Sequence, residues 1–179
     1  GRLTAGTTDT GRVVDLVSCH AGEGGVMLLG SGPGAAGLLN DHLRRYVMYR
    51  DDVRVTDASA QVGVIRVLGR GALSVVARAA ADLVPARSTE ATEGVLALEP
   101  GSWVTFDDGP TPVWVARHVE EMRLDGVDVI VPAGRDVEDA AMRLAECGAP
   151  IVRDGTYDAL RIEAGLPAFG HEIDGQANP

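Results

Sequence analysis

The pattern of apolar positions divides the chain into short strands and longer helices. Short apolar runs rich in valine predict strands at residues 13–17, 26–29, 53–55, 62–68, 94–98, 103–106, 113–116 and 127–131. Apolar residues spaced three or four positions apart predict helices at 33–46, 73–83 and 137–147, and a last short helix that ends at Gly165. Strands and helices in this mixed order indicate an α+β fold.

The order of these elements favours a ferredoxin-like arrangement. From residue 25 to 98 the chain reads strand, helix, strand, strand, helix, strand, which is the split βαβ order. The strands at 103–106 and 113–116 follow as a hairpin around a turn at 108–110, and a further strand and helices complete the chain. We therefore expect one α+β region over residues 1–179, with a ferredoxin-like split βαβ subdomain at 25–98.

The last helix has clear start and stop signals. Thr156 or Asp154 is placed to cap its first turn with a side-chain oxygen. Gly165 suits the left-handed residue that closes a helix, and Pro167 prevents the helix from continuing. The sequence therefore predicts a short helix followed by an irregular segment.

Two charged residues are candidates for chemistry. Asp15 interrupts the apolar strand at 13–17, where a buried carboxylate is costly unless it has a partner or reaches solvent. It either lies on the solvent side of a half-exposed strand or faces a polar pocket, where one carboxylate can perform general acid–base catalysis. Arg161 is two residues from Glu163, so the two do not pair on the helix. Its guanidinium can instead bind a ligand carboxylate or an internal acid such as Asp15 or Glu172.

A glycine-rich segment at 32–37 fits the G-x-G-x-x-G pattern of dinucleotide sites, and Asp57 follows at the spacing of a ribose-binding acid. Two features argue against such a site. Only a few residues join the predicted strand that ends near Asp57 to the next strand, which allows a hairpin but not the crossover that a parallel neighbour needs. Pro33 also removes one backbone N–H that would hold phosphate. We therefore expect no NAD or flavin dinucleotide binding.

Charge and composition argue against several classes of function. The formal net charge of -10 argues against a general nucleic-acid surface, but it allows an anionic small ligand beside a local arginine cluster. The two cysteines, Cys19 and Cys147, lie far apart, which predicts neither a disulfide framework nor a metal site. No apolar run approaches the ~20 residues of a membrane span, and no signal peptide is visible. We expect a cytoplasmic protein with no metal and no membrane contact.

The end of the chain resembles a known family. Residues 158–172 read D-x-L-R-x-E-x-G-x-x-x-x-G-x-E, which is similar to a segment of the glycine-cleavage T-protein (aminomethyltransferase) superfamily. Residues 11–15 resemble the G-G-x-x-D-D strand of that superfamily. Leu166 and Pro167 resemble its YgfZ branch, a folate-binding family linked to iron–sulfur enzyme maintenance and tRNA modification. Gly1 is not a natural start, so we expect a fragment that lacks the N-terminal segment and the C-terminal cysteine-containing signature.

The resemblance implies tetrahydrofolate as the ligand. It implies that Asp15 is the catalytic residue that assists methylene transfer, and that Asp15, Tyr157, Arg161 and Glu172 bind the folate. Two positions depart from the pattern of T-proteins. Tyr157 stands where they carry an arginine, and Leu124 stands where they carry a glutamate that contacts the pterin.

Three functions remain open after this comparison. The first is a YgfZ-type tetrahydrofolate-binding protein in one-carbon metabolism or iron–sulfur enzyme maintenance, with a possible protein partner in that pathway or in glycine cleavage. The second is an aminomethyltransferase of the glycine cleavage system, so an enzyme here would be a folate-dependent aminomethyl or one-carbon transferase. The third is a ligand-free ferredoxin-like interaction domain. We also expect the fragment alone to bind folate poorly, because a cavity that lacks its N-terminal wall encloses less of a ligand.

Overall fold

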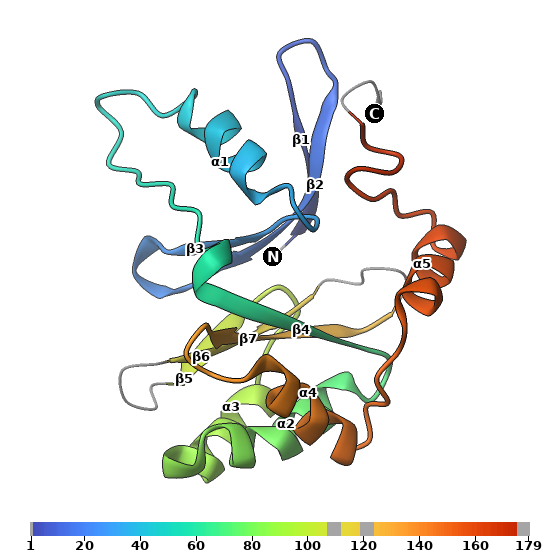
Figure 1. Cartoon of the computed structure of the whole chain (residues 1–179). Helices are drawn as coiled ribbons and strands as arrows, with labels where there is room; N and C mark the ends of the chain where they lie inside the picture. The colour runs from blue at the N-terminus through green and yellow to red at the C-terminus, as the bar shows by residue number, and fades with distance from the viewer. Residues whose placement is uncertain (1, 107–111, 119–123, 175–179) are drawn as a thin grey trace.

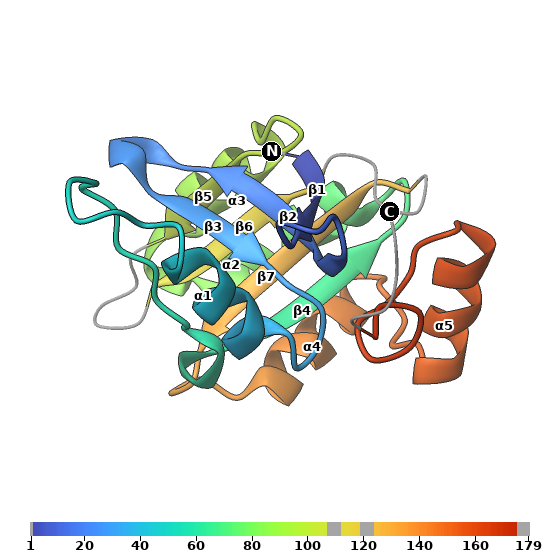
Figure 2. The ribbon, with the colours of Figure 1, turned by 90° about the horizontal axis from the view of Figure 1, so that it is seen from above.

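Two antiparallel sheets and a layer of helices make up the fold. The computed structural model describes residues 2–106, 112–118 and 124–174 of the chain. A three-stranded sheet lies over one face of a four-stranded sheet, and helices cover the opposite face of the larger sheet (Figure 1, Figure 2). This mixed structure with antiparallel sheets confirms the predicted α+β class and is consistent with a ferredoxin-like core.

The smaller sheet is built from the first three strands. Its strands are β1 (Arg2–Thr7), β2 (Val13–Ala21) and β3 (Met27–Gly30), with β2 in the centre. Helix α1 (Ala36–Arg44) lies on the side of this sheet that faces away from the larger sheet (Figure 1). β2 therefore has cover on both faces, which explains why most of its residues are buried and why it reads as a nearly continuous apolar run.

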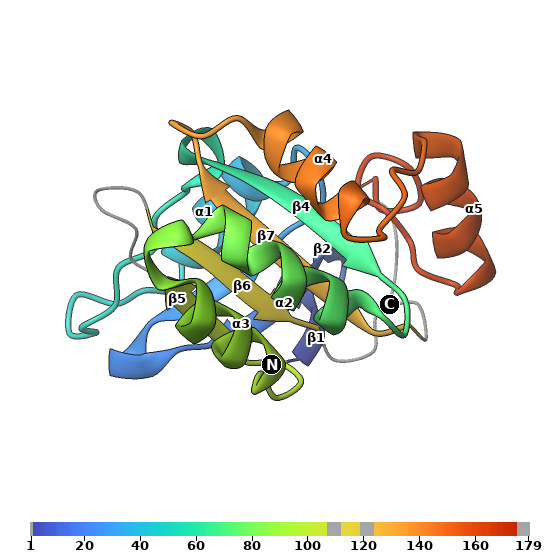
Figure 3. The ribbon, with the colours of Figure 1, turned by 90° about the horizontal axis from the view of Figure 1, so that it is seen from below.

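The larger sheet carries the main hydrophobic core. Its strand order is β4 (Val62–Leu68), β7 (Gly126–Pro132), β6 (Val113–Arg117) and β5 (Trp103–Phe106). Helices α2 (Ala72–Leu83), α3 (Ser88–Leu96) and α4 (Val137–Glu146) cover its outer face, as Figure 3 shows from below. The small side chains of Ala72, Ala77, Ala79 and Ala80 in α2 are buried, so this helix can pack closely against its neighbours.

Helix α5 (Asp154–Glu163) lies beside the two sheets rather than in the helix layer (Figure 1, Figure 3). Gly165 has φ +73 and closes the helix as the sequence predicts. The predicted cap is wrong, because Asp154 and Thr156 lie inside the helix and Arg153 precedes it without a side-chain cap. Among the described residues no helix is both long and apolar enough to cross a membrane.

Two of the predicted strands are wrong. Residues 53–55 form no strand, and the hairpin that was expected to join them to β4 is absent. Instead the Asp57 carboxylate accepts from the Ser59 N–H at 2.8 Å and starts a 3-10 turn at Ser59–Gln61. The second predicted strand, at 94–98, coincides with the end of α3 and the residues just after it.

Helix packing explains why the strand predicted at 94–98 is absent. Ala91 and Val95 are both buried and lie four residues apart, so they form one apolar stripe along α3. The predicted hairpin is confirmed, since β5 and β6 pair as antiparallel strands. Its predicted turn at 108–110 lies outside the described residues.

Candidate functional site

One cavity of about 410 Å³ opens where the smaller sheet meets the C-terminal segment. Its wall is formed by β1, β2, the end of β3 with the loop after it, β4 and the segment from α5 to His171. The lining includes Asp15, Gly32, Arg66, Tyr157, Arg161 and Phe169. The volume falls within the range of about 300–1,000 Å³ that is usual for small-molecule sites.

Asp15 is buried at the wall of this cavity. Its side chain is on β2 and the residue is only 1% exposed, so the expectation of a solvent-facing acid on a half-exposed strand is wrong. The Gly32 N–H donates to its Oδ2 at 2.8 Å, which partly offsets the cost of burial. Burial raises the pKa of Asp15, and the N–H groups of Gly32 and Leu16 counter part of that rise. A carboxyl with a raised pKa is better placed to exchange a proton near neutral pH.

Gly32 belongs to the glycine-rich segment that resembles a dinucleotide motif. Its N–H points at Asp15, and a β-carbon added to it would lie 3.0 Å from Cβ of Phe169 and 3.1 Å from Oδ1 of Asp15. β3, which precedes the segment, pairs with β2 alone among the described strands, and that pair is antiparallel. The segment therefore supports a carboxylate in the described structure, and it does not follow a strand of a parallel sheet as in dinucleotide-binding folds.

Arg161 also lines the cavity, but two carboxylates of its own chain engage it. Its Nε donates to Asp158 at 2.7 Å and its Nη1 donates to Oε2 of Glu172 at 2.8 Å. The Ala168 N–H donates to the same Glu172 oxygen at 2.9 Å. The hydrogen bond to Asp158 and the contact with Glu172 raise the pKa of Arg161 despite its burial. Arg161 thus ties α5 to the irregular segment that follows it.

The cavity brings together three of the four predicted site residues. Asp15, Tyr157 and Arg161 lie on its wall, and Tyr157 is half-buried there. Glu172 is not part of the wall and contacts Arg161 instead. Their roles toward a ligand remain predictions, because the contacts described so far join residues of this chain to one another.

The sequence reasoning missed a buried polar group next to the cavity. Asp128 on β7 bonds to Arg66 on β4, and His118 lies just after β6 with Nε2 2.9 Å from Oδ2 of Asp128. The His20 ring from β2 meets the His118 ring edge-on, with centroids 5.3 Å apart. Asp128 interrupts the apolar run of β7 as Asp15 interrupts that of β2, so the same signal could have identified it.

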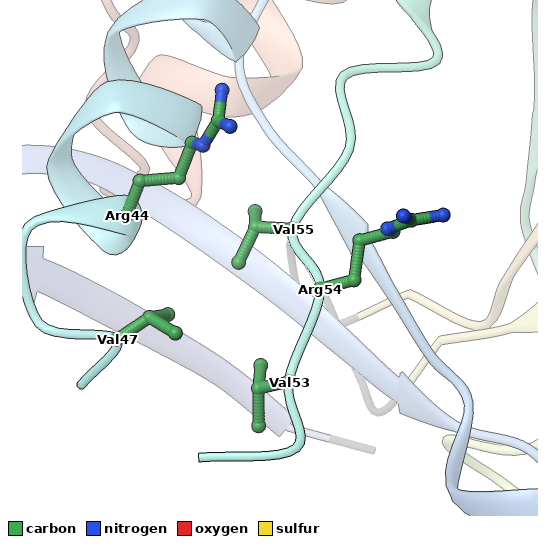
Figure 4. A pocket seen from close by; sticks show the side chains of 5 residues that line it. All are labelled: Arg44, Val47, Val53, Arg54 and Val55. Atoms are coloured by element: carbon green, nitrogen blue, oxygen red, sulfur yellow. The ribbon is translucent and has the colours of Figure 1, made fainter. Parts of the chain in front are cut away.

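A second hollow, of about 290 Å³, lies between the end of α1 and the segment that leads toward β4 (Figure 4). Figure 4 shows the side chains of Val47, Val53 and Val55 grouped together, with Arg54 pointing away from them. Arg44 and Arg54 are exposed and the lining contains no acid. It offers no pair of opposed charges, so the cavity at Asp15 is the stronger candidate site.

Metal chemistry finds no support in the described part of the chain. Within residues 2–106, 112–118 and 124–174, no three His, Cys, Asp or Glu side chains are grouped so that they could hold a metal ion. Both cysteines are free and half-buried.

The chain is similar in sequence to several proteins named aminomethyltransferase. No family model matches the chain. It is 31% identical over 177 residues to an aminomethyltransferase of Cutibacterium acnes, covering 96% of this chain and 46% of that protein. It is 30% identical over 174 residues to an aminomethyltransferase of Herpetosiphon aurantiacus, covering 96% of this chain and 43% of that protein. A third, from Thermus thermophilus, is 40% identical over 55 residues, which is 31% of this chain and 16% of that protein. The chain thus spans less than half the length of these relatives.

Proposed function

We propose that this chain, which belongs to the glycine-cleavage T-protein (aminomethyltransferase) superfamily, binds a reduced folate in the cavity beside Asp15. The observation that carries the proposal is the buried Asp15 carboxylate at the wall of a ligand-sized cavity. A carboxylate contributes nothing to a hydrophobic core, and its burial costs free energy unless a hydrogen-bonding or charged partner contacts it. Because the relatives are named aminomethyltransferase, a folate is the first ligand to test.

In this proposal Asp15 meets the pterin end of the ligand. A pterin presents N–H groups to a carboxylate, and a carboxylate beside a reacting nitrogen can accept or return a proton during one-carbon transfer. Burial raises the pKa of Asp15, so the group takes up a proton more readily than an exposed aspartate does. The Gly32 N–H donates to Oδ2, and in this proposal Oδ1 is the oxygen that meets the ligand.

Two finer functions are open within the superfamily. Aminomethyl transfer is supported by the names of the relatives and by the acid at Asp15. A YgfZ-type folate-binding role, with its link to iron–sulfur maintenance, is supported by Leu166 and Pro167, which line the cavity. Leu124, at the position of the pterin-contacting glutamate of T-proteins, weakens the first. An assay of one-carbon transfer to tetrahydrofolate separates the two functions, because only an aminomethyltransferase would catalyse that transfer.

Calorimetric titration with tetrahydrofolate tests the binding proposal. Asp15→Asn keeps the size of the side chain and removes its charge, so it should weaken binding by about 1–3 kcal/mol, the range for a hydrogen bond to a charged group. The matched control is Asp52→Asn, which neutralises an exposed carboxylate in the irregular segment before β4. The proposal fails if Asp15→Asn folds normally and binds tetrahydrofolate as tightly as the control does.

A further inference from the structure

The C-terminal wall of the cavity is folded onto itself. This wall, residues 154–173, consists of α5 and the irregular segment that follows it. Nη1 of Arg161 donates to Glu172 at 2.8 Å, and the same Glu172 oxygen accepts from the Ala168 N–H at 2.9 Å. The Leu166 N–H donates to the Arg161 carbonyl at 2.8 Å. These hydrogen bonds make residues 154–173 one compact unit.

This unit is bonded to itself but not to the sheets. Within residues 2–106, 112–118 and 124–174, no hydrogen bond or ion pair joins residues 154–173 to a strand. The unit approaches the smaller sheet through Phe169, whose Cβ lies 3.0 Å from the position of a β-carbon built on Gly32. Figure 1 and Figure 3 show α5 beside the sheets, outside the helix layer. An apolar contact without hydrogen bonds opens at a lower cost in free energy than paired strands do.

A short connector joins this unit to the helix layer. The end of α4 is well held, since the Ala149 N–H donates to the Leu144 carbonyl at 3.1 Å. Residues 150–152 then have no secondary structure, and no hydrogen bond links them to any of the residues that the structure describes. Ile151 and Val152 are 67% and 54% exposed. The backbone can therefore change its φ and ψ angles at residues 150–152 with little loss of contacts, as a hinge requires.

The cavity lies between this unit and the sheets. Half of the residues that line it belong to residues 154–173, and the others lie on the strands and on the loop after β3. A rotation about residues 150–152 would displace half of the wall at once, while Asp15 and its hydrogen bond to Gly32 would stay with the smaller sheet. Because small-molecule sites usually enclose most of their ligand, the site is complete only when the unit rests against the sheets.

We infer that residues 154–173 form a lid that moves as one body about residues 150–152, opens to admit a ligand and closes on it. The ligand that the lid closes on rests on the proposed function, whereas the movement itself does not. The structure shows the lid closed, with Phe169 against Gly32. Lid movements take place in microseconds to milliseconds, and a ligand that contacts both walls favours the closed state because it binds that state more tightly.

Residual dipolar couplings of the unaltered, ligand-free chain test the movement. Amides of one rigid body report one alignment tensor, and movement about a hinge reduces the magnitude of that tensor. We expect the amides of residues 154–173 to fit a single tensor of smaller magnitude than the tensor of the two sheets. The inference is wrong if one tensor of one magnitude fits the sheets and residues 154–173 together. It is also wrong if residues 154–173 do not share a tensor.

The same couplings with saturating tetrahydrofolate test what the lid closes on. The magnitude for residues 154–173 should rise to that of the sheets, because the ligand joins the two walls. If tetrahydrofolate binds in the cavity and this magnitude stays the same, the inference fails and the proposed function stands. If tetrahydrofolate does not bind, the proposed function and the closure on a folate both fail, and the couplings of the free chain alone decide whether the lid moves.

A disulfide between the lid and the loop after β3 supplies the locked control. Gly32→Cys with Phe169→Cys places two β-carbons 3.0 Å apart, and a disulfide needs about 3.5–4.5 Å, so a small outward shift of the lid allows the bond. The pair is introduced together with Cys19→Ala and Cys147→Ala, which remove the two native thiols. Oxidised glutathione should form the bond, and the locked lid should then share the tensor and the magnitude of the sheets. Reduction should restore the smaller magnitude. Thiols that do not pair, or couplings that are equal in the oxidised and reduced forms, would overturn the inference.

Discussion

The contact between Gly32 and Asp15 makes a sharp prediction for a one-carbon substitution. In Gly32→Ala the new methyl group would lie 3.0 Å from Cβ of Phe169 and 3.1 Å from Oδ1 of Asp15. Ordinary contacts begin near 3.4 Å, so both neighbours have to move by a few tenths of an ångström. Cβ of Phe169 is fixed to the backbone and cannot rotate away. We expect the Gly32–Asp15 hydrogen bond to lengthen, and overpacking of this kind costs about 1–3 kcal/mol of folding stability.

Gly37 supplies the matched control. It lies on α1 in the same glycine-rich segment, and nothing approaches within 4 Å of a β-carbon added there. Gly37→Ala should therefore leave stability unchanged or raise it slightly, since alanine favours a helix over glycine by about 1 kcal/mol. The two variants differ only in which glycine receives the methyl group.

The assay is a carbon-13 NMR titration of the Asp15 carboxyl, together with urea unfolding. Because the Gly32 N–H lowers the pKa of Asp15, weakening that bond should raise the pKa above its value in the unaltered protein. Gly37→Ala should not move it. The reasoning is refuted if Gly32→Ala shows the same Asp15 pKa and the same unfolding free energy as Gly37→Ala.

Three more predictions concern His20, Arg161 and the glycine-rich segment. Burial lowers the pKa of His20 to about 4. Between pH 6.5 and about 4, His20 is therefore protonated in the unfolded protein but neutral in the folded protein. Stability should fall by about 3 kcal/mol as the pH drops through that window, and urea unfolding of His20→Phe should show a smaller fall. Arg161→Met should lower the melting temperature more than Arg143→Met, because Arg161 joins α5 to Glu172 in the segment that follows, whereas Arg143 pairs with Asp139 within α4. Equal melting temperatures would contradict a stabilising role for the Arg161–Glu172 contact. Calorimetry with NAD should show no stoichiometric micromolar binding, and a clear isotherm would reverse the interpretation of the glycine-rich segment.

The sequence singled out Asp15 as an unusual acid, but it left open whether the side chain faces solvent or a pocket and did not identify its partner. A single acid within an apolar run indicates a carboxylate that needs a reason to be there. The Gly32 N–H that satisfies it comes from a loop beyond the next strand. The glycine pattern of that loop suggested phosphate, because sequence spacing does not show which group an N–H faces.

Arg66 and Asp128 show the same limit more strongly. They lie 62 residues apart in the chain and meet only through the register of β4 against β7. The alternation within each strand shows which of its faces is buried, but it does not show which distant strand lies beside it. Residues 94–98 were misassigned for a related reason, since their apolar composition suits a strand, whereas packing of α3 against α2 makes residues 94–96 the end of a helix.

The most direct test of the folate site is a nitrogen-15 NMR titration of the 179-residue chain with tetrahydrofolate. Mapping by NMR detects weak as well as tight binding and shows which residues the ligand contacts. The account predicts shifts concentrated at the cavity wall, at Leu16, Gly32 and Tyr157, which Asp15→Asn reduces and Asp52→Asn does not. No shift at millimolar tetrahydrofolate, or shifts confined to the hollow at Val47 and Val53, would contradict it.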